Sequence, residues 1–382
     1  MTEPGSTVAR ESNPSGALAA IWQKILPVGV TAERFAAQKR FSNLDGLRCI
    51  SIVGVVWFHI VKPADSWPIL WRRGYTGVDL FFVISGFLIT TLLLRERDST
   101  GTIALGKFYM RRSLRIVPLY YAVLLLYLVK SLRYSEQLAA QNFLHNFPYF
   151  ATYTSNLFVH RTGEPIPFFF AWSLAAEEQF YLLWPFVFRF APRLFSRLFI
   201  PAMLVFSIAI DEHVFIAHGT EAATLWYRMP VPITFGVLVA QLLHDRRTFP
   251  MMAALTGRRF SAAFWLALAL LALSMEEPSM WLFRVPFTFL VCSCVIREDN
   301  ALSVVLRLRL FVYIGTVSYG IYLLHFSAQN LVFKVLGFVG VQPGVLEFPL
   351  VLGMSILLAG LSFRYFERWF LKTKDRYAVV TG

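Results

Sequence analysis

Residues 44–60, LDGLRCISIVGVVWFHI, decide the fold, because this apolar run is typical of a membrane-spanning helix. Arg48 lies near its start and His59 near its end. Eleven residues of helix correspond to three turns plus about 20°, so both side chains should share one face, roughly 16 Å apart along the axis. With Arg48 at one membrane surface, we expect His59 near the middle of the bilayer or beyond.

An ionisable side chain at the depth expected for His59 is costly. Charged residues near mid-bilayer cost about 2.5–3.5 kcal/mol on insertion scales, so they usually face a cavity or a partner. His59 is therefore a candidate functional residue. The alternative is a histidine that only makes a hydrogen bond between helices. This stretch does not decide between the two.

The composition indicates a polytopic membrane protein. Hydrophobic residues make up 57% of the 382 residues, charged residues 15%, and the mean hydropathy is +0.56, whereas soluble domains are about 45–50% apolar. A net charge of +13 would suggest nucleic acid for a soluble chain, but the positive-inside rule explains it here. We expect no nucleic-acid partner. Cys49, Cys292 and Cys294 all fall in apolar spans, so we expect neither disulfides nor a metal site.

We predict an all-α membrane bundle of ten transmembrane helices, with both termini cytoplasmic. The spans are about 44–62, 77–95, 115–132, 168–189, 198–211, 223–243, 260–275, 280–296, 310–334 and 345–366. This topology places 27 of the 36 Lys and Arg residues on the inner side. Residues 1–43 are predicted as a flexible cytoplasmic tail, 44–370 as the membrane domain, and 371–382 as a cytoplasmic C-terminal tail. The longest outer loop is about 133–167.

Asp79 lies in the first turn of the second span. An antiparallel hairpin of spans one and two puts it at a depth similar to that of His59. Its carboxylate could orient the imidazole, which would make Asp79 a catalytic candidate. It could equally cap the N-terminus of the helix.

Three arginines precede the third span in KFYMRRSLRIVPLYY, residues 107–121. Arg112 and Arg115 are three residues apart and share a helix face, a spacing suited to phosphate groups. Arg111 is a further candidate. The ordinary explanation for such arginines is an anchor at the membrane surface. Arg48 occupies the same surface, which favours a shared binding role.

The fourth span carries FFFAWSLAAEEQFYLLWPF, residues 168–186. Ser173 and Glu177 are one helical turn apart, and Glu177 lies about 18 Å from Arg189 along the helix, the depth expected for His59. Because two adjacent carboxylates are expensive in an apolar run, we expect Glu177 or Glu178 to line a cavity. Proton relay in a transporter is the competing use.

The last two spans carry further polar residues. Ser318, Tyr322 and His325 share a helical stripe in the ninth span, compatible with a sugar site or with hydrogen bonds between helices. In the tenth, Arg364 and Glu367 are spaced as an ion pair.

The sequence resembles the acyltransferase-3 family of integral membrane acyltransferases, which modify bacterial surface polysaccharides and some small glycosylated molecules. The matching pieces run in the family's order from about 44 to 369: Arg48 with His59, GVDLFFVISGFLI, FYMRRSLRIVPLYY, WSLAAEEQFYLLWP, GTVSYGIYLLH and FRYFER. Each piece is weakly specific, and six in order are highly specific.

The resemblance implies ten membrane helices in the bacterial inner membrane and an acetyl- or acyl-coenzyme A donor bound from the cytoplasm. It further implies that His59 is the essential histidine, that Arg48, Arg112 and Arg115 bind the donor, and that Trp172 and Glu177 lie in the central site. Together with the residues described above, this gives three sets of candidates. The candidate catalytic residues are His59, Glu177 and Asp79, and the candidate donor-binding residues are Arg48, Arg111, Arg112 and Arg115. The candidate acceptor-binding residues are Trp172, Ser173, Tyr181, Ser318, Tyr322 and His325.

The predicted activity is transfer of an acetyl group to a sugar hydroxyl of a polysaccharide or glycoconjugate. The acceptor could be a glycan, a lipid-linked sugar or a small glycoside, and the lipid bilayer is the other expected partner. A proton-coupled transporter of sugars or lipid-linked intermediates is the main alternative, because intramembrane His and Glu also relay protons. A third alternative is a membrane scaffold whose polar residues only form hydrogen bonds between helices. The oligomeric state stays open.

Overall fold

The computed structural model describes residues 27–159, 164–191, 231–276, 278–338 and 344–377, together with 198, 201–202, 205 and 340. Within these residues the regular structure is helical and contains no strand, which confirms the predicted all-α class. The predicted fifth span (198–211) and the first part of the sixth (223–230) lie largely outside the described residues.

Five helical segments are long and apolar enough to cross a membrane. They are Ser42–Val61 (α3), Gly74–Thr100 (mostly α5, Gly77–Thr100), Leu105–Arg133 (α6), Ser318–Phe338 (α18) and Gly344–Thr373 (which includes α19, Glu347–Ser362). Phe249–Thr256 (α13) and Ser261–Leu273 (α14), bent by 73°, would make a sixth. Trp172–Phe190 (α9), Val231–His244 (α12) and Met280–Ile296 (α15) are further apolar helices. The chain is therefore a multi-pass membrane protein, while the count of ten spans stays a prediction.

Three predicted boundaries are wrong. Helix α6 begins at Leu105, ten residues before the predicted third span, so the arginines after Lys107 lie within the helix. The predicted ninth span is two helices, Arg309–Thr316 (α17) and Ser318–Phe338 (α18), separated at Val317. The predicted outer loop contains two helices, Leu138–Ala151 (α7) and Ser155–Phe158 (α8).

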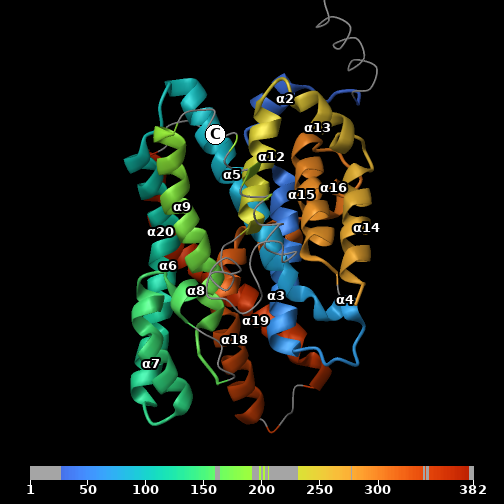
Figure 1. The fold of residues 1–382 in the computed structure, drawn as a ribbon. Coiled ribbons are helices and arrows are strands. Elements are labelled where there is room, and N and C mark those ends of the chain that lie inside the picture. The colour runs from blue at the N-terminus through green and yellow to red at the C-terminus, as the bar shows by residue number, and fades with distance from the viewer. Residues whose placement is uncertain are drawn as a thin grey trace, which may run out of the picture.

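The short helices mark the two ends of the bundle. Ala32–Ala37 (α2) and α13 lie at the upper end in Figure 1, whereas Ile69–Arg72 (α4) and α7 lie at the lower end. This separation agrees with the predicted sorting of these segments to opposite sides of the membrane. Which side is cytoplasmic stays a prediction.

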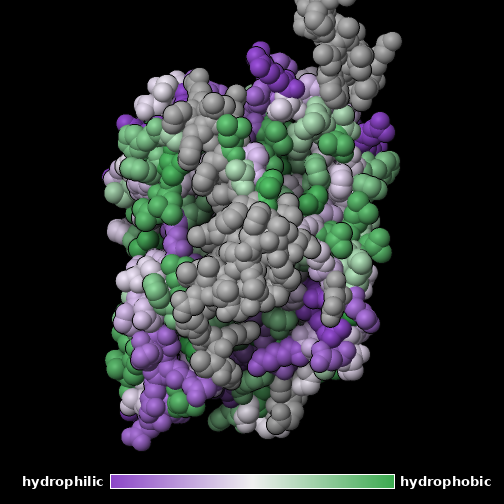
Figure 2. All heavy atoms as spheres, viewed as in Figure 1, coloured by the Kyte–Doolittle hydropathy of each residue, from purple (hydrophilic) through white to green (hydrophobic). Residues whose placement is uncertain are grey.

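The outer surface of the bundle is suited to lipid. Helix α9 exposes Leu182, Leu183, Phe186 and Phe190, each more than half accessible. In Figure 2 hydrophobic residues lie along both flanks of the bundle, and hydrophilic residues gather towards its lower end and at its upper rim. Helices that are apolar on their outer face are stable in hydrocarbon, because nothing polar is left without a partner there.

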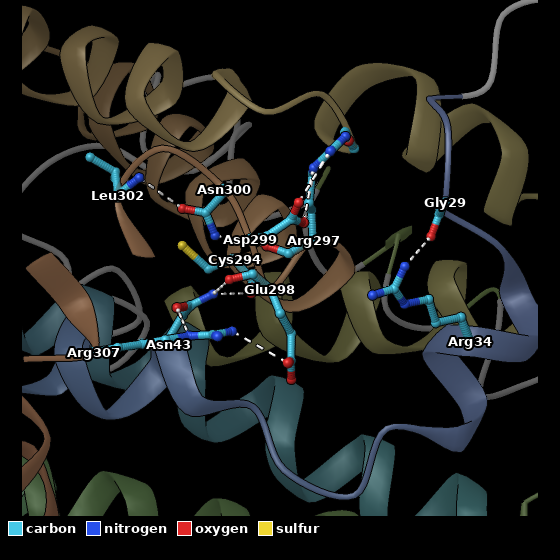
Figure 3. Close-up of polar contacts among 11 residues, drawn as sticks. Gly29, Arg34, Asn43, Cys294, Arg297, Glu298, Asp299, Asn300, Leu302 and Arg307 are labelled. Atoms are coloured by element: carbon cyan, nitrogen blue, oxygen red, sulfur yellow. Dashed lines mark hydrogen bonds and ion pairs between the residues drawn. The ribbon is translucent and has the colours of Figure 1, made fainter. Parts of the chain in front are cut away.

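The start of α3 is fixed by a buried asparagine (Figure 3). Asn43, 1% exposed, donates through Nδ2 to the carbonyl oxygens of Cys294 (3.0 Å) and Glu298 (3.2 Å) and accepts from Nε of Arg307 (3.0 Å). Arg307 also pairs with the Glu298 carboxylate at 3.3 Å. These bonds satisfy the amide of Asn43 on both sides and hold the helix that carries Arg48 and His59 against the end of α15.

Candidate active site

Two cavities meet at the three arginines that the sequence singled out. The larger has a volume of about 670 Å³ and the smaller about 100 Å³. Arg48, Arg112 and Arg115 line both. The predicted cluster of these cations is therefore present, and it lies where the two spaces join.

The arginines reach this junction from two helices. Arg48 extends from α3 and pairs with Asp45 one turn earlier, at 3.3 Å. Arg112 and Arg115 extend from one face of α6, and the Arg112 guanidinium lies 5.3 Å from the centre of the Tyr181 ring. Among the described residues neither Arg112 nor Arg115 has an ion-pair partner. Their charges are thus available to an anionic ligand.

The larger cavity is strongly cationic. Its basic residues are Lys39, Arg40, Arg48, Arg95, Arg112 and Arg115, and its acidic residues are Asp45 and Glu367. Such an excess of positive charge with low-dielectric walls concentrates anions. The predicted pair of Arg364 and Glu367 is not formed, because residues 363–367 adopt a π-helical turn that changes their angular spacing. Glu367 instead accepts from Ser362 at 3.0 Å and faces the cavity.

The smaller cavity is lined by polar groups from six helices, α3, α5, α6, α9, α17 and α18. Eight predicted site residues line it: Arg48, Arg112, Arg115, Ser173, Glu177, Tyr181, Ser318 and Tyr322. The hydroxyls of Ser85 and Tyr181 both donate to Oε1 of Glu177. Glu178 lies beside it in the same lining. The expectation that at least one of the two carboxylates faces a cavity is therefore confirmed.

Tyr322 forms part of the wall of the smaller cavity, and its backbone carbonyl contacts His325. Its hydroxyl donates to the carbonyl oxygen of Phe170 at 2.6 Å and lies 2.7 Å from Oγ of Ser173. Because the tyrosine proton goes to the carbonyl, Ser173 is the donor to Tyr322. This chain of bonds fixes the phenol ring between α9 and α18.

His59 and His325 form a pair behind this wall. His59 Nδ1 lies 3.0 Å from His325 Nε2, and the rings stack with centroids 5.0 Å apart and an interplanar angle of 11°. His325 is fully buried, and its Nδ1 lies 2.6 Å from the carbonyl oxygen of Tyr322. Neither histidine belongs to the described lining of the two cavities. A contact between helices, the alternative considered for His59, is thus present.

Asp79 has an ion-pair partner that the sequence analysis did not anticipate. Its carboxylate pairs with Nε of Arg284 on α15 at 2.9 Å. It is also not the N-cap of α5, which is Thr76. The expectation that Asp79 caps α5 is therefore wrong, and the Arg284 partner was not anticipated, whereas an orienting role toward His59 is still a prediction. A role for Asp79 in catalysis stays a prediction.

Two other predicted residues lie outside the cavities. Arg111 pairs with Glu96 at 3.2 Å and donates to the carbonyl of Tyr377 at 2.7 Å. Since Glu96 is only 3% exposed, this pair joins α5 to α6. Trp172, at the start of α9, packs edge-to-face on Phe82 with centroids 6.3 Å apart.

Sequence reasoning assigned no site role to several groups that lie at or near the site: Ser85, Glu96, Arg284, Tyr319 and Glu367. Arg284 carried a usable signal, because it lies inside the apolar run MWLFRVPFTFL, residues 280–290, and intramembrane charges are functional or paired by default. Ser85 carried no such sequence signal, because a serine beside a glycine in a membrane helix is common where helices pack closely.

A multi-pass helical bundle with a cationic cavity beside partly buried carboxylates defines an integral membrane protein with a polar site within its helices. The acyltransferase-3 family, described as an acyltransferase domain, matches residues 41–364. The chain therefore belongs to this family, as the order of its motifs predicted.

Curated relatives agree with this assignment. The chain is 27% identical over 357 residues to the peptidoglycan O-acetyltransferase OatA of Listeria monocytogenes, covering 87% of this chain and 56% of the relative. It is 26% identical over 366 residues to a putative O-acetyltransferase of Staphylococcus aureus, a match that covers 89% of this chain and 58% of the relative. It is 25% identical over 359 residues to O-acetyltransferase OatA of the same species, a match that covers 88% of this chain and 58% of the relative. The chain thus spans somewhat more than half the length of these relatives. No solved structure matches.

Proposed function

We propose that this protein transfers an acetyl group from acetyl-coenzyme A to a hydroxyl of a sugar in a bacterial polysaccharide or glycoconjugate, in the bacterial inner membrane. The observation that carries the proposal is the position of Arg48, Arg112 and Arg115 at the junction of the two cavities. Membership of an acyltransferase family supplies the reaction type.

The donor would enter the larger cavity, whose cations suit the phosphates of a nucleotide. Arginine binds phosphate through bidentate, charge-assisted hydrogen bonds. Arg112 and Arg115 fit this task better than Arg111, which Glu96 engages. The donor supplies an activated thioester, and the long pantetheine arm would extend past the arginines towards Glu177 and Tyr322.

His59 would act on the acceptor hydroxyl. In direct transfer the imidazole takes the hydroxyl proton, a carbon–oxygen bond forms, the carbon–sulfur bond breaks, and the thiolate receives the proton. In the alternative route the imidazole first carries the acetyl group. Either route requires the thioester to reach beyond the wall at Tyr322, because His59 is not among the described residues that line the two cavities. Glu177 would balance the charge of Arg112 beside the reacting atoms.

Relatives suggest which acceptor to test first. One relative is named a peptidoglycan O-acetyltransferase, so peptidoglycan is the first candidate, and other surface glycans are the second. No described contact favours transport without acyl transfer, so the transporter alternative is not carried further.

The test compares cells that lack the chain, cells that carry it, and cells that carry His59→Ala. Base-labile acetate is measured separately in purified peptidoglycan and in the remaining surface glycan. We expect ester acetate in one fraction only when the wild-type chain is present. Equal ester content with His59→Ala, at equal membrane abundance of the protein, would contradict the role of His59. Absence of any difference between the first two strains would contradict the acetyltransferase proposal.

A further inference from the structure

The contacts of His325 determine which of its nitrogens carries a proton. Nδ1 of His325 lies 2.6 Å from the carbonyl oxygen of Tyr322. A carbonyl oxygen can only accept a hydrogen bond. Nδ1 of His325 is therefore the protonated nitrogen.

The second nitrogen of His325 is then an acceptor. The ring is completely buried, and its described neighbours include His59, the Tyr322 carbonyl and the aromatic rings of Phe170, Tyr322 and Phe326. A positive charge in such surroundings is costly, so the neutral ring is favoured. A neutral imidazole with a proton on Nδ1 has a lone pair on Nε2.

That lone pair determines the tautomer of His59. Nε2 of His325 lies 3.0 Å from Nδ1 of His59. Because two lone pairs at this distance would repel, Nδ1 of His59 must donate. In the neutral ring of His59 the unprotonated nitrogen is then Nε2.

We infer that His325 is a positioning residue that holds His59 in the tautomer whose Nε2 is the basic and nucleophilic nitrogen. This inference rests on the proposed function and deepens it. The near-parallel stacking of the rings, 11° apart, also fixes the plane of the His59 imidazole. The Ser173, Tyr322 and Phe170 bonds anchor the segment of α18 from which His325 extends.

The same tautomer of His59 suits both direct transfer and the acyl-histidine route. Nε2 of His59 takes the proton of the acceptor hydroxyl while the carbon–oxygen bond forms and the carbon–sulfur bond breaks. The resulting imidazolium keeps its Nδ1–H bond to the lone pair of His325, which stabilises the new charge, and the Nε2 proton then goes to the coenzyme A thiolate. In the acyl-histidine route the same Nε2 carries the acetyl group. His325 exchanges no proton in either case.

A matched pair of variants separates positioning from packing. His325→Gln places a carbonyl oxygen near the former Nε2 and can accept from His59, whereas His325→Leu fills similar space without an acceptor. We expect His325→Leu to lower kcat about 100-fold, the usual scale for loss of a general base, with an unchanged KM for acetyl-coenzyme A. We expect His325→Gln to recover at least a tenth of the wild-type kcat.

Nitrogen-15 NMR of histidine-labelled protein in lipid nanodiscs determines the tautomer of His59 without the need for enzyme turnover. His59→Asn identifies the His59 signals by difference. We expect a protonated Nδ1 and an unprotonated Nε2 at His59 in the wild type, and a mixture of tautomers in His325→Leu. A His59 protonated at Nε2 in the wild type would overturn the inference, even if a variant fails to fold.

The outcomes also separate this inference from the proposed function. If His59→Ala stays active, the proposed function of His59 fails. If His59→Ala is inactive while His325→Leu matches the wild type in kcat, the inference alone fails. Equal losses in both His325 variants, with equal losses of thermal stability, would assign His325 a packing role and overturn it.

Discussion

Glu177 illustrates how individual side chains provide hydrogen bonds to a partly buried carboxylate. Its carboxylate accepts two hydroxyl donors, from Ser85 and Tyr181, and faces the same small cavity as Arg112. A buried carboxylate is tolerated only when hydrogen bonds and opposite charge offset its desolvation. The hydroxyls are therefore part of what holds the Glu177 carboxylate in place at this cavity.

Replacing Glu177 with Gln should separate its charge from its shape. The amide is nearly isosteric but leaves the Arg112 charge unbalanced and gains donors that face the two hydroxyls. We expect kcat to fall at least 10-fold with normal membrane abundance, measured as acetyl transfer in proteoliposomes. Glu164→Gln, on an exposed loop position, is the matched control and should leave turnover unchanged. Equal rates for the two variants would contradict a role for Glu177.

Arg115 and Arg111 offer a matched comparison within one helix. Hydrogen bonds to charged groups are worth about 1.5–3 kcal/mol, so Arg115→Gln should raise the KM for acetyl-coenzyme A by about 10- to 150-fold. Arg111→Gln removes the partner of the buried Glu96 and should lower the melting temperature while leaving KM unchanged. Steady-state kinetics and thermal melts of both proteins check this. A KM raised equally by both would contradict the assignment.

The sequence predicted the cavity residues better than their pairings. Helical spacing brought Arg48, Arg112 and Arg115 to one surface and placed Ser318 and Tyr322 on one face, and these residues do line the smaller cavity. Partners from distant helices were not predictable, because spacing says nothing of which helices meet. Asp79 with Arg284, 205 residues apart, is the example.

At the scale of helices, α5 and α12 pack with their backbones in contact. A Cβ on Gly86 would overlap the carbonyl oxygen of Ile233, and a Cβ on Gly236 would overlap that of Val83. Small residues allow this approach between membrane helices, where packing rather than the hydrophobic effect drives association. The contact holds Ser85, and so Glu177, in position. A glycine inside an apolar span such as Gly86 indicates close packing between helices, but the sequence does not tell which helix is the partner.

Gly86→Ala should destabilise the bundle because the added methyl group forces α5 and α12 apart. Overpacking of this kind costs about 1–3 kcal/mol. Gly353→Ala in α19 is the control, because nothing lies within 4 Å of its added Cβ, and it should leave stability unchanged or slightly higher. Thermal melts in detergent compare the two. A Gly86→Ala protein as stable as the control would contradict the close contact.

The break in the predicted ninth span shows a limit of reading helices from periodicity. YIGTVSYGIYLLHFS is apolar enough for one helix, yet α17 ends at Thr316 and α18 begins at Ser318. Gly315 lies against the backbone of Asp45, where a Cβ would overlap the carbonyl oxygen. This long-range contact accompanies the break, and no local pattern encodes it. Its consequence is functional, because Thr316 and Ser318 both reach the cavity.

At the scale of the whole molecule, the donor and the acceptor would approach His59 from opposite ends of the bundle. The larger cavity is lined by residues 39–48 and by the first turns of α6, the side that the charge distribution assigns to the cytoplasm. The proposal therefore has the coenzyme A donor bind from the cytoplasmic side. The same arrangement would let a glycan on the far side receive the acetyl group without the donor crossing the membrane.

Cysteine labelling tests this sidedness directly. Cys49, Cys292 and Cys294 are buried, so the wild type should react little with a membrane-impermeant maleimide. Thr316 is exposed and lines both cavities, so Thr316→Cys should react in inside-out vesicles, not in intact spheroplasts, and saturating coenzyme A should slow labelling at least 10-fold. Labelling from the periplasmic side would reverse the predicted topology. Labelling that coenzyme A leaves unchanged would remove the donor from this cavity, whichever side it faces.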